Sequence, residues 1–366
     1  MDRHRSTAST TVAPLRALLL TCLFSLYLCS VTAIPSVPVE SFSLSDVTEN
    51  RGDTVLELVA ALESSGILSL RDVPAYAETR KRFLKVATEC AALSDVPGVQ
   101  SKTLRDGTTR RTISTKSQLH NPSLAHTTVE NDCPRYLPEL RAFSELLNVV
   151  ALRLARAIDG ALKTLPSSHS KSEKLEDIVA SAQHLDHFHA YSSPRSDTKP
   201  AVNGDVDEDQ EDAVLSLDLH TDNGIMILMT TPEFYAVRDG HTPTSVSRDK
   251  ITAGAQASAG LLIQQPRQHH VVQPVLMDDE LIVMIGEGYK SWMYSTLDFK
   301  AVLHGMQMPQ FSPALGQISR SWFGKMILLP RDRQMKNLGL TFEEYSERAT
   351  NFVVHGQQKG TAGFNQ

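Results

Sequence analysis

The chain has 366 residues, of which 41% are hydrophobic, and its formal net charge is −6. This composition excludes an intrinsically disordered protein, and the length suits one large domain or two small ones. Neither sign of charge dominates, and basic residues do not cluster with aromatic ones, so nothing indicates a nucleic-acid partner. We attribute the net charge to ordinary solubility.

Residues 1–33 have the pattern of a secretory signal peptide. Basic residues precede an apolar run from Ala17 to about Cys29, and small residues end at Ala33, where signal peptidase would cut. A bilayer needs about 20 apolar residues, so we favour a cleaved signal over a retained anchor that would tether the protein to a membrane. The expected location is therefore secreted or endomembrane-lumenal, with no membrane span in the mature chain.

The expected mature chain retains two cysteines, Cys90 and Cys133. An oxidising compartment would allow them to form a disulfide. Spacing alone cannot establish the required geometry. A disulfide and two buried free thiols therefore stay open as alternatives.

Residues 34–182 are expected to form a helical or mixed N-terminal region. The helices are predicted from apolar residues three and four positions apart, and Gly66 ends the first long helix. The expected elements are a strand at 34–39, a helix at 54–65, a strand at 67–70, and helices at 75–93, 136–165 and 175–182.

The pattern changes near residue 183 to short strands rich in Val, Ile, Leu and Met. Many short strands without intervening helices favour a closed or double-sheet antiparallel architecture. We expect a jelly-roll core at 183–335 and a C-terminal tail or helix at 336–366, which gives an α+β fold, mainly β with a helical layer. The expected strands lie at 215–221, 224–230, 260–265, 280–286, 301–306 and 321–330.

A candidate metal site follows the first of these strands. His220 and Asp222 are two residues apart, so on an extended strand both can face one ion. His304, at the end of a later apolar strand, can supply a third ligand. Two histidines and one carboxylate are the facial triad of non-haem Fe(II), which leaves positions open for oxygen and a cosubstrate. Each residue could instead serve only a turn, but their conjunction favours metal binding and an iron-dependent oxygenase.

Several segments resemble the Fe(II)- and 2-oxoglutarate-dependent oxygenases of the isopenicillin N synthase-like group, over nearly the whole mature chain. His220-Thr221-Asp222-Asn223-Gly224 resembles the first metal motif, and Ala301-Val302-Leu303-His304 resembles the distal histidine segment. Ile285-Gly286-Glu287 is similar to the turn before that segment, and residues 186–194 to the strand whose tyrosine, here Tyr191, contacts the cosubstrate. The resemblance implies a double-stranded β-helix with N-terminal helices packed on one sheet, and Fe(II) held by His220, Asp222 and His304.

The resemblance also implies a cosubstrate site. The family binds the far carboxylate of 2-oxoglutarate with an arginine, followed two residues later by a hydroxyl. Arg320 is the candidate because a guanidinium matches a carboxylate in two-pronged geometry, but Trp322 stands where the hydroxyl is expected. The alternatives are a surface Arg320 paired with an acidic residue, Lys325 as the cation, and Tyr191 as a core aromatic.

Other residues are expected near this site. His187 and His189 share one strand face and His184 lies on the other, so we interpret all three as structural or pocket-lining. The acidic stretch 192–212 has too little apolar content for a core and is expected to form a loop near the metal entrance. The expected pocket walls are Ile225, Ile227, Met284, Trp292 and Phe323.

The activity implied by the family is decarboxylation of 2-oxoglutarate to succinate, coupled to oxidation of a small-molecule or side-chain substrate by molecular oxygen. Two rival hypotheses remain. One keeps the fold and iron but oxidises the substrate without 2-oxoglutarate. The other is a catalytically silent jelly-roll binding protein, supported by Trp322 and by Gly305, which follows His304 where arginine is common in the family.

Overall fold

The computed structural model divides the chain into two units, Met1–Ile34 and Pro35–Gln366. The proposed signal peptide and residues 194–212 of the acidic stretch lie outside the described residues. Within those residues, no helix combines the length and apolar character needed to cross a membrane. The described ranges are 34–51, 53–93, 95–119, 129–163, 173–193, 215–238, 242–251, 259–266, 269–335 and 339–354, the last six residues by backbone alone.

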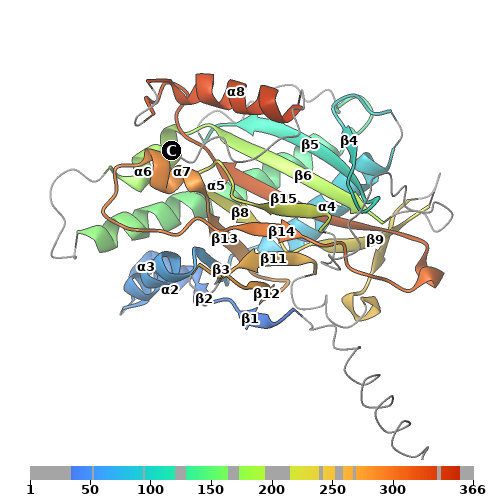
Figure 1. The fold of residues 1–366 in the computed structure, drawn as a ribbon, viewed down its shortest axis with the longest axis horizontal. Helices are drawn as coiled ribbons and strands as arrows, with labels where there is room; N and C mark the ends of the chain where they lie inside the picture. The colour runs from blue at the N-terminus through green and yellow to red at the C-terminus, as the bar shows by residue number, and fades with distance from the viewer. Residues whose placement is uncertain are drawn as a thin grey trace, which may run out of the picture. The chain divides into compact units, whose positions relative to one another are not determined.

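Two mixed β-sheets form the centre of the second unit (Figure 1). The five-stranded sheet has the order β1 (Ser36–Pro38), β12 (Val271–Val275), β11 (Leu261–Gln264), β14 (His304–Met306), β7 (Leu217–His220). The ten-stranded sheet runs β2 (Ser41–Ser43), β3 (Ile67–Arg71), β13 (Leu281–Ile285), β8 (Met226–Met229), β15 (Gln317–Ile327), β6 (His184–Ser192), β5 (Thr109–Ser117), β4 (Gln100–Thr103), with β9 (Glu233–Val237) beside β15 and β10 (Thr244–Val246) beside β9.

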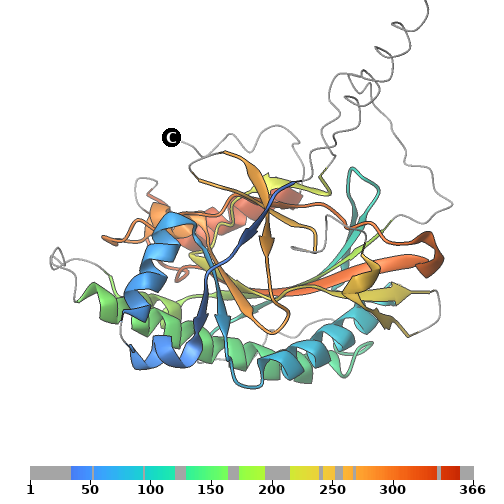
Figure 2. The ribbon, with the colours of Figure 1, turned by 90° about the horizontal axis from the view of Figure 1, so that it is seen from below.

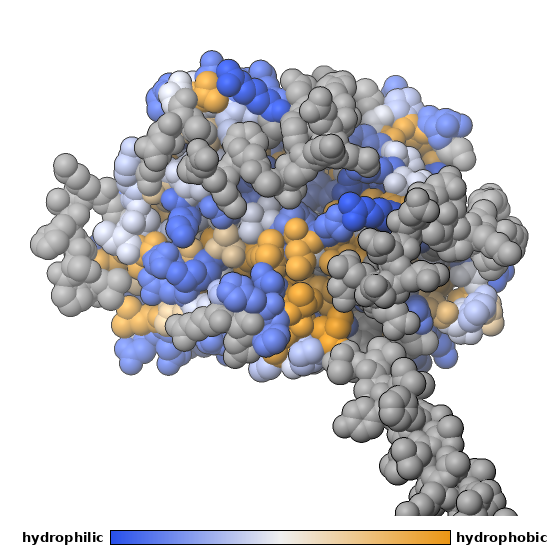
Figure 3. All heavy atoms as spheres, in the orientation of Figure 1, coloured by the Kyte–Doolittle hydropathy of each residue, from blue (hydrophilic) through white to orange (hydrophobic). Residues whose placement is uncertain are grey.

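The two sheets pack face to face through apolar side chains. Ile227 and Met284 of the larger sheet belong to the same buried cluster as Leu261 and Ile263 of the smaller one. Apolar residues also gather on the side of the molecule seen in Figure 3, over β14, β11 and β12, between hydrophilic flanks. The short strands are therefore apolar almost continuously because their residues serve a sheet-to-sheet core.

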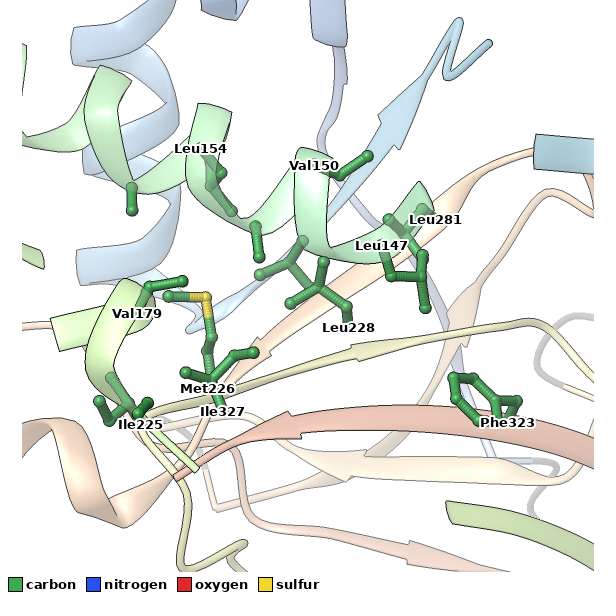
Figure 4. Packing of buried hydrophobic residues seen from close by; sticks show 14 of the residues in the cluster. Leu147, Val150, Leu154, Val179, Ile225, Met226, Leu228, Leu281, Phe323 and Ile327 are labelled. Atoms are coloured by element: carbon green, nitrogen blue, oxygen red, sulfur yellow. The ribbon is translucent and has the colours of Figure 1, made fainter. Parts of the chain in front are cut away.

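Helices cover the other face of the larger sheet. Figure 2 shows α4 and α5 running beneath its strands, and Figure 4 shows Leu147 and Leu154 of α5 above Leu228, Phe323 and Ile327 of the sheet. Burying each such side chain contributes about 1.5–3 kcal/mol. The helices are α2 (Leu44–Glu49), α3 (Thr54–Ser64), α4 (Tyr76–Ala92), α5 (Tyr136–Leu162), α6 (Leu175–Ser181), α7 (Glu287–Trp292) and α8 (Phe342–Val354).

The elements predicted from periodicity are present within a few residues of their expected bounds, and the fold class is α+β. The β4–β5 hairpin was not predicted. Its sequence is polar and lies inside the region expected to be helical or mixed, yet β5 pairs along its whole length with β6. A strand near a sheet edge, with one side toward a polar cavity, lacks the apolar run that marks a buried strand.

Cys90 and Cys133 form a disulfide, which settles the alternative left open by their spacing. Cys90 lies in the last turns of α4, and Cys133 precedes α5. The bond therefore ties together the two longest helices that cover the larger sheet. Closing a loop of this sequence separation, 43 residues, stabilises the fold by about 4 kcal/mol in the chain-entropy model.

Candidate metal centre

The three predicted metal ligands lie together at the edge of the smaller sheet. His220 ends β7 and pairs directly with His304 of β14, so their imidazole rings lie with centroids 4.5 Å apart. Asp222 follows β7, and its Oδ2 lies 4.0 Å from Nε2 of His304. One ligand atom from each residue falls within 4.8 Å of the others. Strand pairing thus brings the remote imidazole to the neighbouring pair.

Hydrogen bonds fix how both imidazoles point. Nδ1 of His220 lies 2.9 Å from the carbonyl oxygen of Asp218, and Nδ1 of His304 lies 3.0 Å from that of Val302. A carbonyl accepts only, so each Nδ1–H donates and each Nε2 keeps a lone pair for a metal ion. Burial lowers the pKa of His220, and His304 lowers it further. Both effects favour the neutral form that binds metals.

Glycines allow the loop that carries Asp222 to be held by backbone. The N–H of Glu287 donates to the carbonyl of Asp222 at 2.8 Å, and that of Gly288 donates to Gly224 at 3.0 Å. A Cβ at Gly286 would lie 2.2 Å from the Gly224 oxygen, so only glycine permits this approach. The turn that resembles the family's segment before the distal histidine therefore supports the aspartate.

Gly305, next to His304, has a packing reason. A Cβ there would lie 2.8 Å from the carbonyl oxygen of Leu217 on the paired strand β7. A side chain at this position would push apart the two strands that carry the histidines. The glycine at a position where the family often has arginine is consequently compatible with an intact metal site.

A cavity of about 260 Å³ lies between the sheets and includes the three candidate ligands. Its apolar wall comes from both sheets, and its polar wall comes from β5, β6 and β15. The lining residues are Arg110, His187, His189, Tyr191, Leu217, His220, Asp222, Ile227, Met229, Leu261, Met284, His304, Gly305, Met306, Arg320 and Trp322.

The polar wall is organised in rows across three strands. Strand register places residues of β5, β6 and β15 side by side, and alternate residues of each strand face the cavity. The result is a surface of polar and aromatic groups on the otherwise apolar inner face. The rows are Arg110–Tyr191–Arg320, Thr112–His189–Trp322 and Ser114–His187–Gly324.

Arg320 is a buried cation inside the cavity, and the surface alternative is wrong. Its side chain is among the largest that are fully buried, and Nε donates to the carbonyl oxygen of Ala259 at 2.7 Å. The guanidinium lies 5.9 Å from the centroid of the Tyr191 ring, which also lines the cavity. Burial lowers the pKa of Arg320 to about 10, so the group is still charged at neutral pH.

The face assignments along β15 follow strand alternation. Trp322 lines the cavity beside Arg320, as predicted, while Ser321 faces the helices and contacts Thr88 at 2.8 Å. Lys325 also points to the helix side, where Nζ lies 2.7 Å from Oδ1 of Asp186. The alternative in which Lys325 binds the cosubstrate is therefore wrong.

The histidines of β6 divide between the two faces as predicted. His187 and His189 line the cavity, and His184 is buried below α6, with Nε2 3.0 Å from the carbonyl of Val179. Nδ1 of His189 lies 2.8 Å from the Thr112 hydroxyl, and its Nε2 lies 2.8 Å from Nδ1 of His187. Burial is the main cause that lowers the pKa of both cavity histidines, which keeps them neutral.

The expected pocket walls were partly wrong. Ile227 and Met284 line the cavity, but Ile225 and Phe323 belong to the core beneath the helices. Trp292 packs instead against Phe342 and Tyr345 at α8. Met293, which could have touched a substrate, is a core residue.

Arg110 was missed altogether. It faces the cavity from β5, in a strand that the sequence reading did not detect. The only local signal is the alternation of Arg110, Thr112 and Ser114 with residues of the other face. That pattern is too polar to indicate a strand by itself.

No protein-family model matches the sequence, and no curated protein matches it in sequence. Solved structures match it in fold. The dioxygenase for auxin oxidation 1 from Arabidopsis thaliana, in complex with 2-oxoglutarate, is 15% identical, with a TM-score of 0.52, and the match covers 80% of this chain and 94% of that one. The full-length Neurospora crassa T7H, in complex with alpha-KG and thymine, is 12% identical, with a TM-score of 0.57 and coverage of 86% and 97%.

A third solved structure, JOX2 in complex with 2OG, Fe and JA, is 13% identical, with a TM-score of 0.56, and the match covers 87% of this chain and 86% of that one. Identity at this level establishes architecture only. The chain has the fold of the Fe(II)/2-oxoglutarate-dependent dioxygenases.

Proposed function

We propose that the protein is an Fe(II)- and 2-oxoglutarate-dependent dioxygenase that oxidises a small molecule. The observation that carries the proposal is the convergence of His220, Asp222 and His304 in a cavity that also holds the buried cation Arg320. The two facing sheets support a double-stranded β-helix, or jelly-roll, core, with the N-terminal helices packed on the larger sheet. Molecular oxygen is the expected second cosubstrate.

The donor set suits Fe(II). Two neutral imidazoles with free Nε2 atoms and one carboxylate match the ligand types of a facial triad. Bound iron and 2-oxoglutarate supply the oxidising chemistry, in which the keto acid loses carbon dioxide and becomes succinate. The task of the chain's own residues is to hold, orient and enclose these groups.

Arg320 and Tyr191 are the residues proposed to orient 2-oxoglutarate. The guanidinium has donors left beyond the Nε that binds Ala259, and it stays charged in a site of low polarity. Trp322 supplies no hydroxyl acceptor or donor of the kind expected two residues after the arginine. The neighbouring phenol of Tyr191, across the strand pair from Arg320, is placed to take over that contact.

An anaerobic titration tests the proposal. Fe(II) is added to the purified protein with 2-oxoglutarate, and the weak visible charge-transfer band of the ternary complex is expected to form in the wild type. The variant His304→Ala should form no such band. A protein that binds neither Fe(II) nor 2-oxoglutarate by calorimetry would be the silent binding protein instead.

One rival is favoured by a specific residue. Trp322 in place of the hydroxyl supports an iron oxidase of the same fold that does not use 2-oxoglutarate. Measuring succinate formation against oxygen consumption separates the two functions. Equal amounts are expected for the dioxygenase, whereas oxygen consumption without succinate would establish the rival.

We also propose that the protein is secreted or lies in an endomembrane lumen. The sequence pattern of residues 1–33 and the Cys90–Cys133 disulfide support this location, because disulfides persist in oxidising compartments. Mass spectrometry of the mature N-terminus is expected to find a chain that begins at Ile34. An intact N-terminus in the membrane fraction would favour the tethered alternative.

A further inference from the structure

The wall opposite Arg320 carries a second arginine that the proposed function does not use. We propose that Arg110 binds the carboxylate of the substrate, and that the substrate is a small organic monocarboxylate with an apolar body. This inference rests on the proposed function, because it assigns the substrate class of the same cavity.

Arg110 is positioned by strand register rather than by a salt bridge. It lies opposite Tyr191 on β6, and Tyr191 lies opposite Arg320 on β15. The two arginines therefore flank one tyrosine, with Cα atoms about 10 Å apart at the usual spacing of neighbouring strands. Arg110 is thus on the β5 side of the cavity, separate from the proposed cosubstrate arginine.

The guanidinium of Arg110 lacks a partner in the fold. Its Nε is buried and has no hydrogen-bond partner among the described residues. On the described cavity wall the single carboxylate is Asp222, which the metal site uses. A buried charged donor without a partner is destabilising. A ligand that supplies the missing acceptor would remove this cost.

The charges of the loaded site indicate a monoanion. The two positive charges of Fe(II) and the one on Arg320 are balanced by Asp222 and by the two carboxylates of 2-oxoglutarate. The histidines of the wall are neutral, since burial lowers the pKa of His187 and His189. Arg110 is then the single uncompensated charge among the described lining residues. One planar guanidinium matches one carboxylate, whereas a phosphate dianion would leave a negative charge.

The remaining walls indicate the rest of the ligand. Leu217, Met306 and Met284 line the cavity with apolar surface. Nε2 of His187 is buried, faces no partner among the described residues, and fits because Gly324 has no side chain to displace it. This neutral nitrogen offers one polar contact between the carboxylate site and the metal. The ligand class is therefore an acid with a mostly apolar body and few polar groups.

Matched acid and amide probes test the proposal. Hexanoate and hexanamide, and 3-phenylpropanoate and its amide, are titrated into the wild type loaded anaerobically with Fe(II) and 2-oxoglutarate, with binding followed by calorimetry. The wild type is expected to bind each acid about 10- to 100-fold more tightly than its amide, the range of one charge-assisted contact.

Two variants localise the effect. Arg110→Gln should reduce the preference for the acid to about twofold or less, because the remaining contacts do not distinguish acid from amide. Lys102→Gln removes the same charge from the exposed residue directly opposite Arg110 on β4 and should keep the wild-type preference. Both variants should bind 2-oxoglutarate as the wild type does.

Several results would overturn the inference. It fails if the wild type binds no acid or shows no preference for acids, or if Lys102→Gln lowers the preference as much as Arg110→Gln. It also fails if Arg110→Gln weakens 2-oxoglutarate binding, since Arg110 would then serve the cosubstrate. Failure of the proposed function is distinguishable: no charge-transfer band forms in the wild type, while the Arg110-dependent preference for acids in the metal-free protein is unaffected.

Discussion

The two faces of the larger sheet treat buried charge in opposite ways. On the helix side, Lys325 forms an ion pair with Asp186, whose other oxygen accepts hydrogen bonds from Ser117 and Ser144 at 3.0 and 2.6 Å. On the cavity side, Arg110 and Arg320 have no carboxylate partner among the described residues, although Arg320 is just as buried. Burial alone therefore does not mark a functional charge. The absence of a partner in a cavity does.

The largest effect should come from the cavity side. His304→Ala removes one of the three candidate ligands, and we expect turnover of 2-oxoglutarate to fall by more than about 1,000-fold, since metal binding and orientation are lost together. The thermal unfolding midpoint should hardly change, because the imidazole bonds only its own strand. His270→Ala, at an exposed histidine of the β11–β12 hairpin, is the control. Retained turnover in His304→Ala would refute the metal assignment.

The helix side should show the reverse pattern. Lys325→Met leaves the Asp186 carboxylate buried without its cation, which should lower the free energy of unfolding by about 3–5 kcal/mol. The double variant Lys325→Met/Asp186→Asn should recover part of this loss, because no buried charge is left. Denaturant unfolding measures both, and calorimetry should find unchanged affinity for 2-oxoglutarate in the folded protein. A large loss of cosubstrate affinity with little loss of stability would break the comparison.

Arg320 sharpens the comparison, because it is as buried as Lys325 but faces the cavity. Arg320→Gln should weaken 2-oxoglutarate binding about 100-fold, the value of a two-pronged charge-assisted contact. Its stability should change little, since the cavity returns water to the site and only the bond to Ala259 is lost. Isothermal titration and thermal unfolding of the same samples give both quantities. A variant with unchanged affinity would favour the oxidase that does not use 2-oxoglutarate.

The sequence predicted this division only where local periodicity carries it. The i, i+2 spacing put His220 beside Asp222, and strand alternation put Trp322 on the side of Arg320 and His184 opposite His187. These relations depend on one strand at a time. Resemblance to a family supplied the remote partner His304, which no local pattern joins to His220.

The relations that failed depend on neighbouring strands or on elements remote in sequence. Arg110 could not be assigned because its role comes from the register of β5 against β6, which the polar sequence of β5 does not specify. Phe323 was placed on the cavity wall although it is three residues from Arg320 and so faces the helices. Trp292 was misplaced because its partner Phe342 comes from the last helix of the chain.

The helix side also predicts a pH dependence of stability. Burial is the main cause that lowers the pKa of His184 to about 4, from an ordinary value of 6.5. The unfolded chain therefore binds a proton between these values while the folded protein does not, so the contribution of His184 is complete above pH 6.5 and is lost as the pH falls toward 4. Between pH 7 and pH 5 the expected loss is about 2 kcal/mol.

Comparing the pH dependence of denaturant unfolding in the wild type and in His184→Gln measures this contribution. The amide can still hydrogen-bond near Val179 and Asn148 but does not titrate, so the variant should lose less stability than the wild type between pH 7 and pH 5. Equal slopes would mean that His184 takes up a proton without unfolding. In that case the helix side would tolerate an unpaired charge, and the difference between the two faces would be smaller than their contacts indicate.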